Sequence, residues 1–477
     1  MDYIILTNPE KCVKCISCIR TCEVHANIVK EDFVDIVPEM CVVCGACIRA
    51  CPENARSYLR QTDIFNEWLK SEKIIAVVAP SYVAHYDEPY KFITALKELG
   101  VSAVYEVAFG AELSSLVIAE EIRSGKKVIA SPCPTVVNYI KKWFPELVDR
   151  LSKAVSPMIA IARYIKKKEP NVKIVFIGPC ISKKSEITQV EVKGDTDLAL
   201  TFEEFDELLK DKKMDLEHLT ETHPDGFDTL YGLSYPVVGG LAKTVSYYLQ
   251  EDLDIVLEKD TVIIDGKENV MKFLEKYSEN IKNGRDDMNP VLSEALYCDG
   301  GCIGGPGIRK DLEVFEKRRR IIEYTLDNLG TKIRDLAQRI YREIDLTREY
   351  IPEKVEYKIP SEAEINSVLK KIGMLKEPLN CGACGYPTCR DRAIAVLNGL
   401  MPWDLCIQYQ LRKMEEEHKR EINKIKEEAI ESAQKVITEQ MKIAQEIASL
   451  LGETVAETKA SLLKILNLVM DETRDEK

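Results

Sequence analysis

The chain has 477 residues, which is too long for one ordinary domain and indicates several. Its formal net charge of −13 provides no overall basic surface for nucleic acid or anionic lipid, so we expect neither as a partner. The first residues show no basic stretch followed by an apolar one, and no later run of about eighteen apolar residues could span a bilayer. We therefore expect a cytoplasmic protein without a membrane anchor.

The chain is rich in cysteine, with sixteen cysteines against five histidines. In a small secreted protein this would suggest disulfides, but the chain is large and shows no export signal. No histidine is spaced from a cysteine as in a zinc finger. Ligation by sulfur without nitrogen favours iron–sulfur chemistry, so we expect all sixteen cysteines to bind iron.

Two similar cysteine runs lie near the amino terminus. Residues 12–22 read CVKCISCIRTC and residues 41–52 read CVVCGACIRACP. Both have the spacing of bacterial two-cluster ferredoxins, in which three cysteines hold one cubane and the fourth reaches the other. We therefore expect a domain over residues 1–65 with two [4Fe–4S] clusters. The predicted ligands are Cys12, Cys15, Cys18 and Cys51 for cluster one, and Cys41, Cys44, Cys47 and Cys22 for cluster two.

Two structural zinc sites are the alternative for these runs. A zinc knuckle usually separates its cysteines into pairs, whereas these cysteines form tight triplets. His25 follows Cys22 closely, but four thiolates are already available, so we expect it at the surface or in a supporting position. Each half of the domain has almost no apolar core, and bound metal would supply much of its folding free energy.

From about residue 70 the chain alternates apolar runs with amphipathic helical stretches. The runs are residues 73–80, 101–107, 126–132 and 172–179. This alternation predicts an α/β domain with largely parallel strands over residues 70–345. Two runs lead directly into cysteine motifs, SPCP at Cys133 and GPCISKK at Cys180, where ligands collect in open α/β sheets. A third motif, EALYCDGGCIGGPG, supplies Cys298 and Cys302.

These three motifs, in this order, resemble the signature motifs of the [FeFe]-hydrogenase domain. FGAE at 109–112 resembles another stretch of that family, and the resemblance covers roughly residues 72–320. It implies a two-lobed domain with largely parallel sheets and an H-cluster, which joins a cubane to a diiron subcluster carrying carbonyl, cyanide and dithiolate ligands. By this resemblance, the cubane ligands are Cys133, Cys180, Cys298 and Cys302.

The resemblance also implies roles around the diiron subcluster. Cys302 would bridge the cubane to it, and Lys183 matches the lysine that donates to a cyanide, so these two residues are the candidate catalytic residues. A buried anionic ligand needs such a charge-assisted donor. Pro80 and Ser81 match the backbone and hydroxyl that contact the other cyanide in the family.

Several positions depart from the family pattern. Pro132 stands where the family has a cysteine that passes protons to the diiron site, so the usual proton relay is interrupted. Val136 replaces a tryptophan, and Gly178 and Leu296 replace two methionines that pack around that site. Glu186 keeps the position of a family glutamate, but without the thiol it does not complete a proton pathway.

A fourth cysteine set lies near the carboxyl end, with the spacing C-x2-C-x4-C-x16-C. It resembles the single-cubane domain of electron-transfer subunits and sensory hydrogenases, and predicts a small helical [4Fe–4S] domain over residues 360–410. Zinc is the alternative for this set taken alone. The predicted ligands are Cys381, Cys384, Cys389 and Cys406.

Residues 411–477 are predicted to form a long helix with a coiled-coil seam. Apolar residues mostly recur three and four apart between Leu411 and Leu450, between flanks of mixed charge. We expect a parallel homodimer; a solvated helix along the protein's own surface is the alternative. The following segment, GETVAETKASLLKILNLVM, resembles the linker before an output module in sensory hydrogenases, which suggests an output domain on another polypeptide.

The sequence as a whole predicts a sensory [FeFe]-hydrogenase-like protein with four [4Fe–4S] clusters and a possible diiron subcluster. It would bind or slowly interconvert H2 with protons and electrons, as an oxidoreductase of low turnover, and relay redox state to ferredoxin or a signalling partner. One alternative is a non-catalytic electron-transfer subunit without the diiron site. Another is an efficient hydrogenase that uses an unrecognised proton route.

Overall fold

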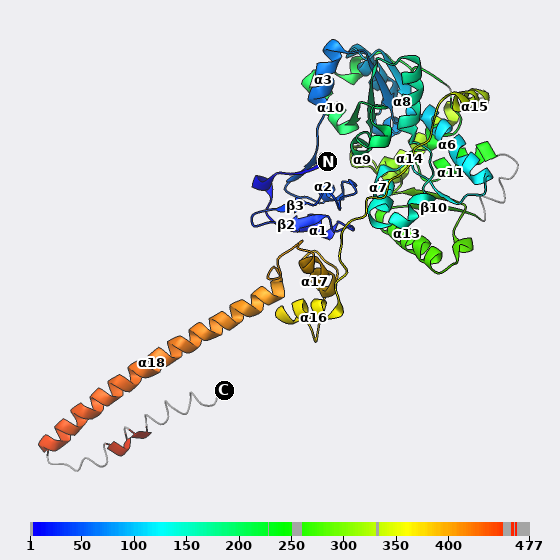
Figure 1. The fold of residues 1–477 in the computed structure, drawn as a ribbon. Coiled ribbons are helices and arrows are strands. Elements are labelled where there is room, and N and C mark those ends of the chain that lie inside the picture. Colours follow the sequence, from blue (N-terminus) through cyan, green and yellow to red (C-terminus); the bar gives the residue numbers. More distant parts are fainter. Residues whose placement is uncertain are drawn as a thin grey trace. The chain divides into compact units, whose positions relative to one another are not determined.

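The structure is a computed structural model that describes residues 3–227, 229–249, 260–330, 333–451, 459–461 and 463–464. The chain forms two compact units (Figure 1). The first contains Met1–Pro360, Gly385–Pro387 and Ile394–Met401, and the second contains Ser361–Cys384, Thr388–Ala393 and Pro402–Lys477. Within the described ranges, no helix is both long and apolar enough to cross a membrane.

Among the described residues, all the strands lie in the first unit. They are β1 (Ile5–Thr7), β2 (Asn27–Val29), β3 (Val34–Ile36), β4 (Arg56–Tyr58), β5 (Ile74–Val78), β6 (Ala103–Glu106), β7 (Val128–Ile129), β8 (Lys173–Gly178), β9 (Leu198–Thr201), β10 (Thr261–Asp265) and β11 (Leu292–Leu296). Its helices are α1 (Ser17–Arg20), α2 (Ala46–Arg49), α3 (Thr62–Ser71), α4 (Tyr82–His85), α5 (Pro89–Glu98), α6 (Val107–Arg123), α7 (Pro134–Trp143), α8 (Pro157–Lys168), α9 (Ser182–Glu186), α10 (Phe202–Asp211), α11 (Gly240–Leu249), α13 (Lys267–Lys282), α14 (Val314–Asp327) and α15 (Ile333–Glu343).

The amino-terminal segment is built from two similar halves. Strand β1 pairs antiparallel with β4, and β2 pairs antiparallel with β3. Each half has one short helix, and both helices start from a left-handed residue four positions after the first cysteine of their run, Ile16 at φ 58° and Gly45 at φ 76°. The ferredoxin-type fold predicted for this segment is confirmed.

Two parallel sheets form the central domain. The first has the order β6-β5-β8-β9 and the second the order β10-β11-β7, and every neighbouring pair in both sheets is parallel. Each predicted apolar run contains a strand, although β7 has only two residues. The predicted α/β architecture with parallel sheets is therefore confirmed (Figure 1).

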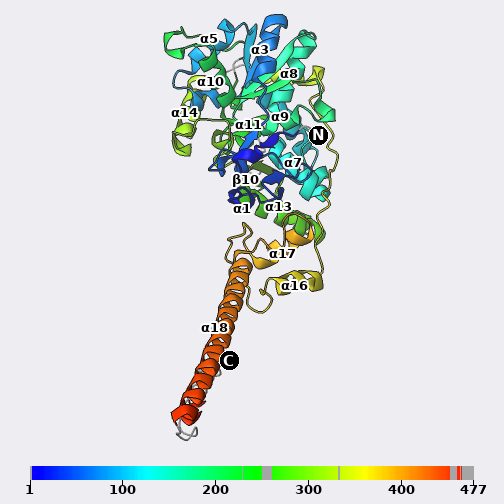
Figure 2. The same ribbon diagram turned by 90° about the vertical axis from the view of Figure 1, so that its left-hand side faces the viewer.

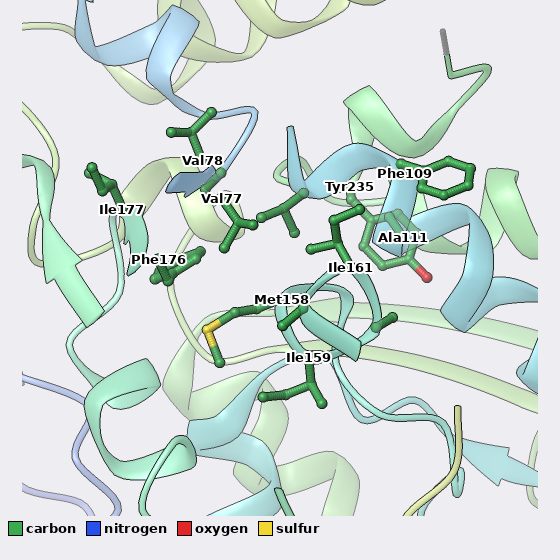
Figure 3. Packing of buried hydrophobic residues seen from close by; sticks show 14 of the residues in the cluster. Val77, Val78, Phe109, Ala111, Met158, Ile159, Ile161, Phe176, Ile177 and Tyr235 are labelled. Carbon is green, nitrogen blue, oxygen red and sulfur yellow. The ribbon is translucent and has the colours of Figure 1, made fainter. Parts of the chain in front are cut away.

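The core of the central domain packs between the first sheet and two helices. Helix α6 crosses α8 closely, because a Cβ at Gly110 would lie 2.0 Å from the carbonyl oxygen of Pro157. Strand residues such as Val77 share one buried cluster with Met158 of α8 and Phe109 of α6 (Figure 3). The cluster includes residues of β7 and β8, the strands that precede Cys133 and Cys180.

The second unit is helical. Its elements are α16 (Glu362–Lys371) and α18 (Ile407–Leu451), while α17 (Cys389–Leu397) is divided between the two units. A capping box between Ser361 and Glu364 begins α16. Helix α18 is continuous over 45 residues (Figures 1 and 2), which confirms the predicted long helix. Most of the segment GETVAETKASLLKILNLVM lies outside the described residues.

Candidate functional site

All sixteen cysteines are free thiols, and the structure gathers them into groups. One pocket is lined by the four cysteines predicted for cluster one, three from the first run and one from the second: Cys12, Cys15, Cys18 and Cys51. Cys15 is exposed, so this group reaches the surface. The buried guanidinium of Arg56 donates from Nη2 to Cys18 Sγ at 3.6 Å.

The second group is more deeply buried. Burial, together with the neighbouring thiol of Cys44, raises the pKa of Cys41 to about 11. Burial also raises the pKa of Cys22, with contributions from Cys44 and Cys41 of the other run. The last cysteine of the first run therefore lies with the second run, as the crossed arrangement of two-cluster ferredoxins requires.

The backbone around these two groups is strained in a symmetric way. Residues in the left-handed region recur at matching distances from the cysteines in both halves: Lys14 (φ 52°) and Val43 (φ 59°), Ile16 (φ 58°) and Gly45 (φ 76°), and His25 (φ 50°) and Asn54 (φ 49°). Five of the six are not glycine, and each of those costs about 1 to 2 kcal/mol. Strain of this kind persists where a bound group holds the chain around it.

Backbone N–H groups also point at the cysteine sulfurs in matching positions. Ala26 donates to Cys22 Sγ at 3.3 Å, and Ala55 donates to Cys51 Sγ at 3.2 Å. Such donors stabilise thiolates that carry the negative charge of a cluster. Among the described residues, no three His, Cys, Asp or Glu side chains are placed to hold one metal ion. A cubane does not need that arrangement, since each of its four thiolates binds a different iron.

The third group lies at the carboxyl ends of strands in the central domain. Cys133 stands between β7 and α7, Cys180 follows β8, and Cys298 and Cys302 follow β11. Burial, together with the neighbouring thiols of Cys133 and Cys180, raises the pKa of Cys302 to about 12. The structure thus brings together the four cysteines of the three central motifs.

A mostly apolar cavity of about 80 Å³ adjoins this group. Its lining includes Pro80, Ser81, Lys183 and Cys302, the four residues predicted to surround a diiron subcluster. The Ser81 side chain is fully buried, and its Oγ has no hydrogen-bond partner among the described residues. An unpaired buried hydroxyl of this kind fits a bound group that accepts a hydrogen bond.

Lys183 is held at the edge of the cavity by two oxygen atoms. Its Nζ donates to Glu186 Oε2 at 2.6 Å and to the carbonyl oxygen of Pro132 at 3.3 Å. The other carboxylate oxygen of Glu186 lies 3.6 Å from a guanidinium nitrogen of Arg348. Glu186 is therefore paired with two cations, and Pro132 contributes only its carbonyl oxygen.

Apolar side chains fill the space around Gly178 and line the cavity. A Cβ at Gly178 would lie 2.4 Å from the Phe176 ring, and Phe176 itself lines the cavity. Leu296 and Met158 also line it. Val136 is fully buried on α7 but is not part of the cavity lining. Phe176, Leu296 and Met158 thus form part of the apolar wall of the cavity.

Two buried carboxylates that were not predicted as site residues shape the cavity wall. Glu112 Oε1 accepts hydrogen bonds from three consecutive backbone N–H groups, ending with Gly232 at 2.8 Å, and Gly232 lines the cavity. Glu294 accepts from the backbone of Gly239 and Ala242 at the start of α11. In the sequence, Glu112 ends the FGAE stretch and Glu294 opens the third cysteine motif.

The second and third cysteine groups are close neighbours. A Cβ at Gly45, next to Cys44, would lie 2.8 Å from the side chain of Ile181, which follows Cys180. Arg49 of α2 donates to the carbonyl oxygen of Gly304 at 3.0 Å, two residues after Cys302. The second group therefore lies between the surface-exposed first group and the central one.

The fourth group lies in the second unit. Asn380 Oδ1 accepts from the backbone N–H of Cys389 at 2.8 Å. Arg392, one turn further along α17, is 1% exposed and donates from Nη2 to the carbonyl oxygen of Trp403 at 2.6 Å. Its Nε and Nη1 have no partner among the described residues. A buried cation with free donors suits an anionic cluster held by the four predicted cysteines, Cys381, Cys384, Cys389 and Cys406.

Three segments of the chain match known families. Residues 72–306 match the iron only hydrogenase large subunit, C-terminal domain. Residues 4–56 match the 4Fe-4S dicluster domain, and residues 378–408 match a family described as an Fe-S cluster. Solved [FeFe]-hydrogenases share the fold, among them a variant of HydA1 from Chlamydomonas reinhardtii, with a TM-score of 0.50 and 17% identity over 62% of this chain and 100% of that chain.

Curated relatives match at modest identity. Iron hydrogenase 1 of Clostridium pasteurianum is 26% identical over 316 residues, which are 53% of this chain and 54% of that protein. The NADP-reducing hydrogenase subunit HndD of Solidesulfovibrio fructosivorans is 27% identical over 284 residues, 49% of this chain and 48% of that protein. The chain thus spans about half the length of these relatives. The cytosolic Fe-S cluster assembly factor NAR1 of Kluyveromyces lactis is 30% identical over 150 residues, 29% of this chain and 31% of that protein.

These matches and the gathered cysteines define the class of protein. Residues 72–306 form a domain of the iron-only hydrogenase type, and the same chain carries a 4Fe-4S dicluster domain. The chain is thus similar to hydrogenases over this domain and carries two further segments that match iron–sulfur domains.

Proposed function

We propose that this protein is a sensory hydrogenase-like protein that binds H2 and turns it over slowly. The observation that carries this proposal is the buried cavity in which Cys302, Lys183 and the unpaired hydroxyl of Ser81 meet. An apolar pocket with a few convergent polar groups is the usual form of a small-ligand site. A diiron subcluster bound there would supply the chemistry that splits and forms H2.

The chain's own residues would hold and shield this group. Lys183 presents a buried ammonium and Ser81 a buried hydroxyl, which suit two anionic acceptor ligands. The apolar walls, including Phe176 and Met158, exclude water. Pro132 has no ionisable proton, so it contributes only its carbonyl oxygen, which accepts from Lys183. We therefore propose low turnover, limited by proton supply.

We further propose that each of the four cysteine sets binds a [4Fe–4S] cluster. The strained, symmetric backbone around the first two sets supports this, as do the N–H groups directed at their sulfurs. Electrons would enter or leave at the exposed first cluster and pass through the second to the central one. The partner would be a ferredoxin-like or signalling protein.

The proposed domains follow these sites, with boundaries at residues 1–65, 70–345, 360–410 and 411–477. We propose that the last of these forms a parallel dimer, supported by exposed apolar residues along α18 such as Met414, Ile425 and Val436. We also propose that the protein works in the cytoplasm, where thiols stay reduced and available to iron.

Infrared spectroscopy tests the central part of this proposal. The whole chain is produced anaerobically together with the hydrogenase maturases, and its carbonyl and cyanide stretching bands are recorded. The proposal predicts such bands, and it predicts that their frequencies change under H2. Protein that carries its cubanes but shows no bands would disprove the diiron assignment.

The slow turnover is tested by the variant Pro132→Cys. A thiol at this position should restore a proton donor. General acid–base groups typically raise a reaction rate by about 10² to 10⁴, so we expect at least about tenfold faster H2 oxidation with an artificial electron acceptor. Pro132→Ala is the control for backbone effects. If both variants keep the diiron bands and neither gains activity, proton supply is not the limit. A wild type that already turns over rapidly would instead favour an alternative proton route.

A non-catalytic electron-transfer subunit is the second candidate. It is favoured by the similarity to NAR1, which is named as an assembly factor, and by the missing relay thiol at Pro132. Deuterium–hydrogen exchange separates the two, because exchange needs the diiron site and cubanes alone do not support it. Exchange above that of protein made without maturases supports the sensory proposal; its absence supports the subunit.

A further inference from the structure

The last turn of α7 is hydrogen-bonded to the loop before the second cysteine run. Lys142 Nζ donates to the carbonyl oxygen of Cys41 at 2.7 Å and to that of Pro38 at 3.0 Å. Trp143 Nε1 donates to the carbonyl oxygen of Met40 at 3.3 Å. The same helix begins directly after Cys133, so α7 joins a ligand of the central set to the loop of the second set.

Lys142 is a buried cation without a carboxylate partner. The residue is 7% exposed, and no carboxylate oxygen of the described residues lies within 4.0 Å of its Nζ. The neighbouring Lys141 is different, because its Nζ pairs with Glu353 at 2.7 Å. Burial lowers the pKa of Lys142, while the nearby Cys41 thiolate raises it. Among the negative groups that raise this pKa, the Cys41 thiolate contributes more than the carboxylates of Glu353 and Glu39.

The first cysteine set has a buried cation of its own, because Arg56 Nη2 donates to Cys18 Sγ at 3.6 Å, and Lys142 is the buried lysine that holds the loop of the second set. A cubane gains a negative charge when it is reduced, and burial disfavours that charge, so a buried cluster is harder to reduce than an exposed one. Each set has one buried cysteine, Cys18 or Cys47, but Cys15 of the first set is exposed and no cysteine of the second set is. Backbone N–H groups donate to sulfur in both sets, Ala55 to Cys51 in the first set, and Ala26 to Cys22 and Val43 to Cys41 in the second.

We propose that Lys142 is a positioning residue whose fixed positive charge raises the reduction potential of cluster two, the cluster beside the central site. The proposal rests on the proposed iron–sulfur ligation of the second set. It does not depend on the diiron subcluster. Lys142 does not touch the cluster sulfurs directly; its charge acts through the loop of Cys41 that it holds.

The test is the midpoint potential of each cluster in the whole anaerobic protein, followed by electron paramagnetic resonance at set potentials. Lys142→Met keeps the length of the side chain and removes its charge. At the wild-type midpoint we expect the ratio of reduced to oxidised cluster two to fall at least about tenfold, a shift of about 59 mV for a one-electron step. The other clusters should move less. Lys142→Arg keeps the charge and should restore the wild-type value.

Lys141→Met is the matched control, because it removes an adjacent buried lysine whose charge is already paired with Glu353. It should leave the potential of cluster two unchanged. Lys142→Gln retains hydrogen-bond donors without charge, and should behave like the methionine variant. Unchanged potentials in Lys142→Met with all clusters present would overturn the proposal, and so would an equal shift in Lys141→Met.

Loss of the second cluster in every Lys142 variant, including Lys142→Arg, would show a purely structural role and also overturn the proposal. Failure of the proposed function gives a different result. Protein without carbonyl and cyanide bands would still show the shift in Lys142→Met, because cluster two is separate from the diiron site. Zinc in place of iron in the second set would remove the basis of the inference altogether.

Discussion

Ser81 is fully buried, and its hydroxyl lies in the cavity wall without a partner among the described residues. A buried hydroxyl that makes no hydrogen bond lowers stability, and replacing it by an apolar group removes that penalty. We therefore predict that Ser81→Ala leaves the thermal midpoint of the cluster-free protein unchanged or raises its free energy of unfolding by about 1 kcal/mol.

In the cluster-loaded protein the same variant should shift a cyanide stretching band, because a hydrogen bond to that ligand is lost. Both measurements use the same preparation, before and after cluster loading. Ser81→Thr, which retains the hydroxyl, serves as the control in the infrared measurement. A destabilised cluster-free Ser81→Ala protein with unaltered bands would assign the hydroxyl to folding rather than to a bound ligand.

Glu106 provides a pH-dependent prediction. Burial raises its pKa from 4.5 to about 7, although the hydroxyl of Tyr324 donates to its Oε1 at 2.9 Å. At a pH between these two pKa values, Glu106 is protonated in the folded protein and ionised in the unfolded chain. The free energy of unfolding therefore falls as the pH rises from about 4.5 to about 7. Glu106→Gln should lose this dependence, worth at most about 3 kcal/mol.

The measurement is the thermal midpoint of wild type and variant at several pH values between 5 and 8, at equal cluster content. The two should be similar at the acid end, and the variant should be the more stable at the alkaline end. The exposed Glu98→Gln variant is the control and should follow the wild type. Parallel curves for wild type and Glu106→Gln would show that Glu106 titrates normally.

Sequence reasoning works well for residues whose spacing carries the chemistry. The two cysteine runs predicted crossed sets, and the structure places Cys22 with Cys41 and Cys44 as expected. The sequence alone does not show that the Phe176 ring fills the space beside Gly178. That depends on how the side chains pack in the folded domain. The unpaired Ser81 hydroxyl was hidden for the same reason, since only the packed structure shows what a buried atom lacks.

At the scale of elements, the short helices beside clusters one and two depend on left-handed residues at their starts. Gly45 has φ 76°, and a Cβ there would lie 2.8 Å from Ile181 Cδ1 and 3.2 Å from Pro306 Cβ. Gly125 has a similar φ of 84°, but a Cβ there would meet nothing within 4 Å. A side chain at either glycine would therefore strain the backbone, but only a side chain at Gly45 would also collide with neighbouring atoms.

We predict that Gly45→Ala lowers the free energy of unfolding by about 2 to 4 kcal/mol, from strain and overpacking together. Gly125→Ala should lose only the strain, about 1 to 2 kcal/mol. Thermal unfolding of both variants at equal cluster content measures the difference. Equal losses would mean that the contact between Gly45 and Ile181 contributes nothing.

The strands of the central domain were predictable because buried parallel strands give short apolar runs between helical stretches. Their ends were less predictable. The run at 101–107 includes Val107, which begins α6, and the run at 126–132 yields only the two residues of β7. In both places the backbone hydrogen bonds of the folded domain, and not the apolar pattern, decide where the strand stops.

At the scale of the whole molecule, α18 extends about 68 Å if its 45 residues rise by about 1.5 Å each. Its apolar side chains lie exposed at seam positions, among them Met414 at 64%, Ile425 at 60% and Val436 at 57%. A row of exposed apolar residues at this spacing is stabilised when a second helix covers it. A second copy of the same chain provides the matching row.

We therefore predict that Ile425→Lys combined with Val436→Lys converts a dimer into a monomer, because two charges would be buried in the seam. Light scattering after gel filtration, at one protein concentration, gives the mass. Glu427→Lys changes the charge away from the seam and should leave the dimer intact. A monomeric wild type would contradict the coiled-coil proposal and leave α18 as a solvated helix.

The central claim is that the sixteen cysteines hold iron in four sets of four. The most direct measurement is iron, zinc and acid-labile sulfide content, with Mössbauer spectroscopy, on the anaerobically reconstituted whole chain. The account predicts about sixteen iron atoms per chain, all in [4Fe–4S] clusters, before any diiron subcluster is added. Stoichiometric zinc, or far fewer iron atoms in fully folded protein, would contradict it.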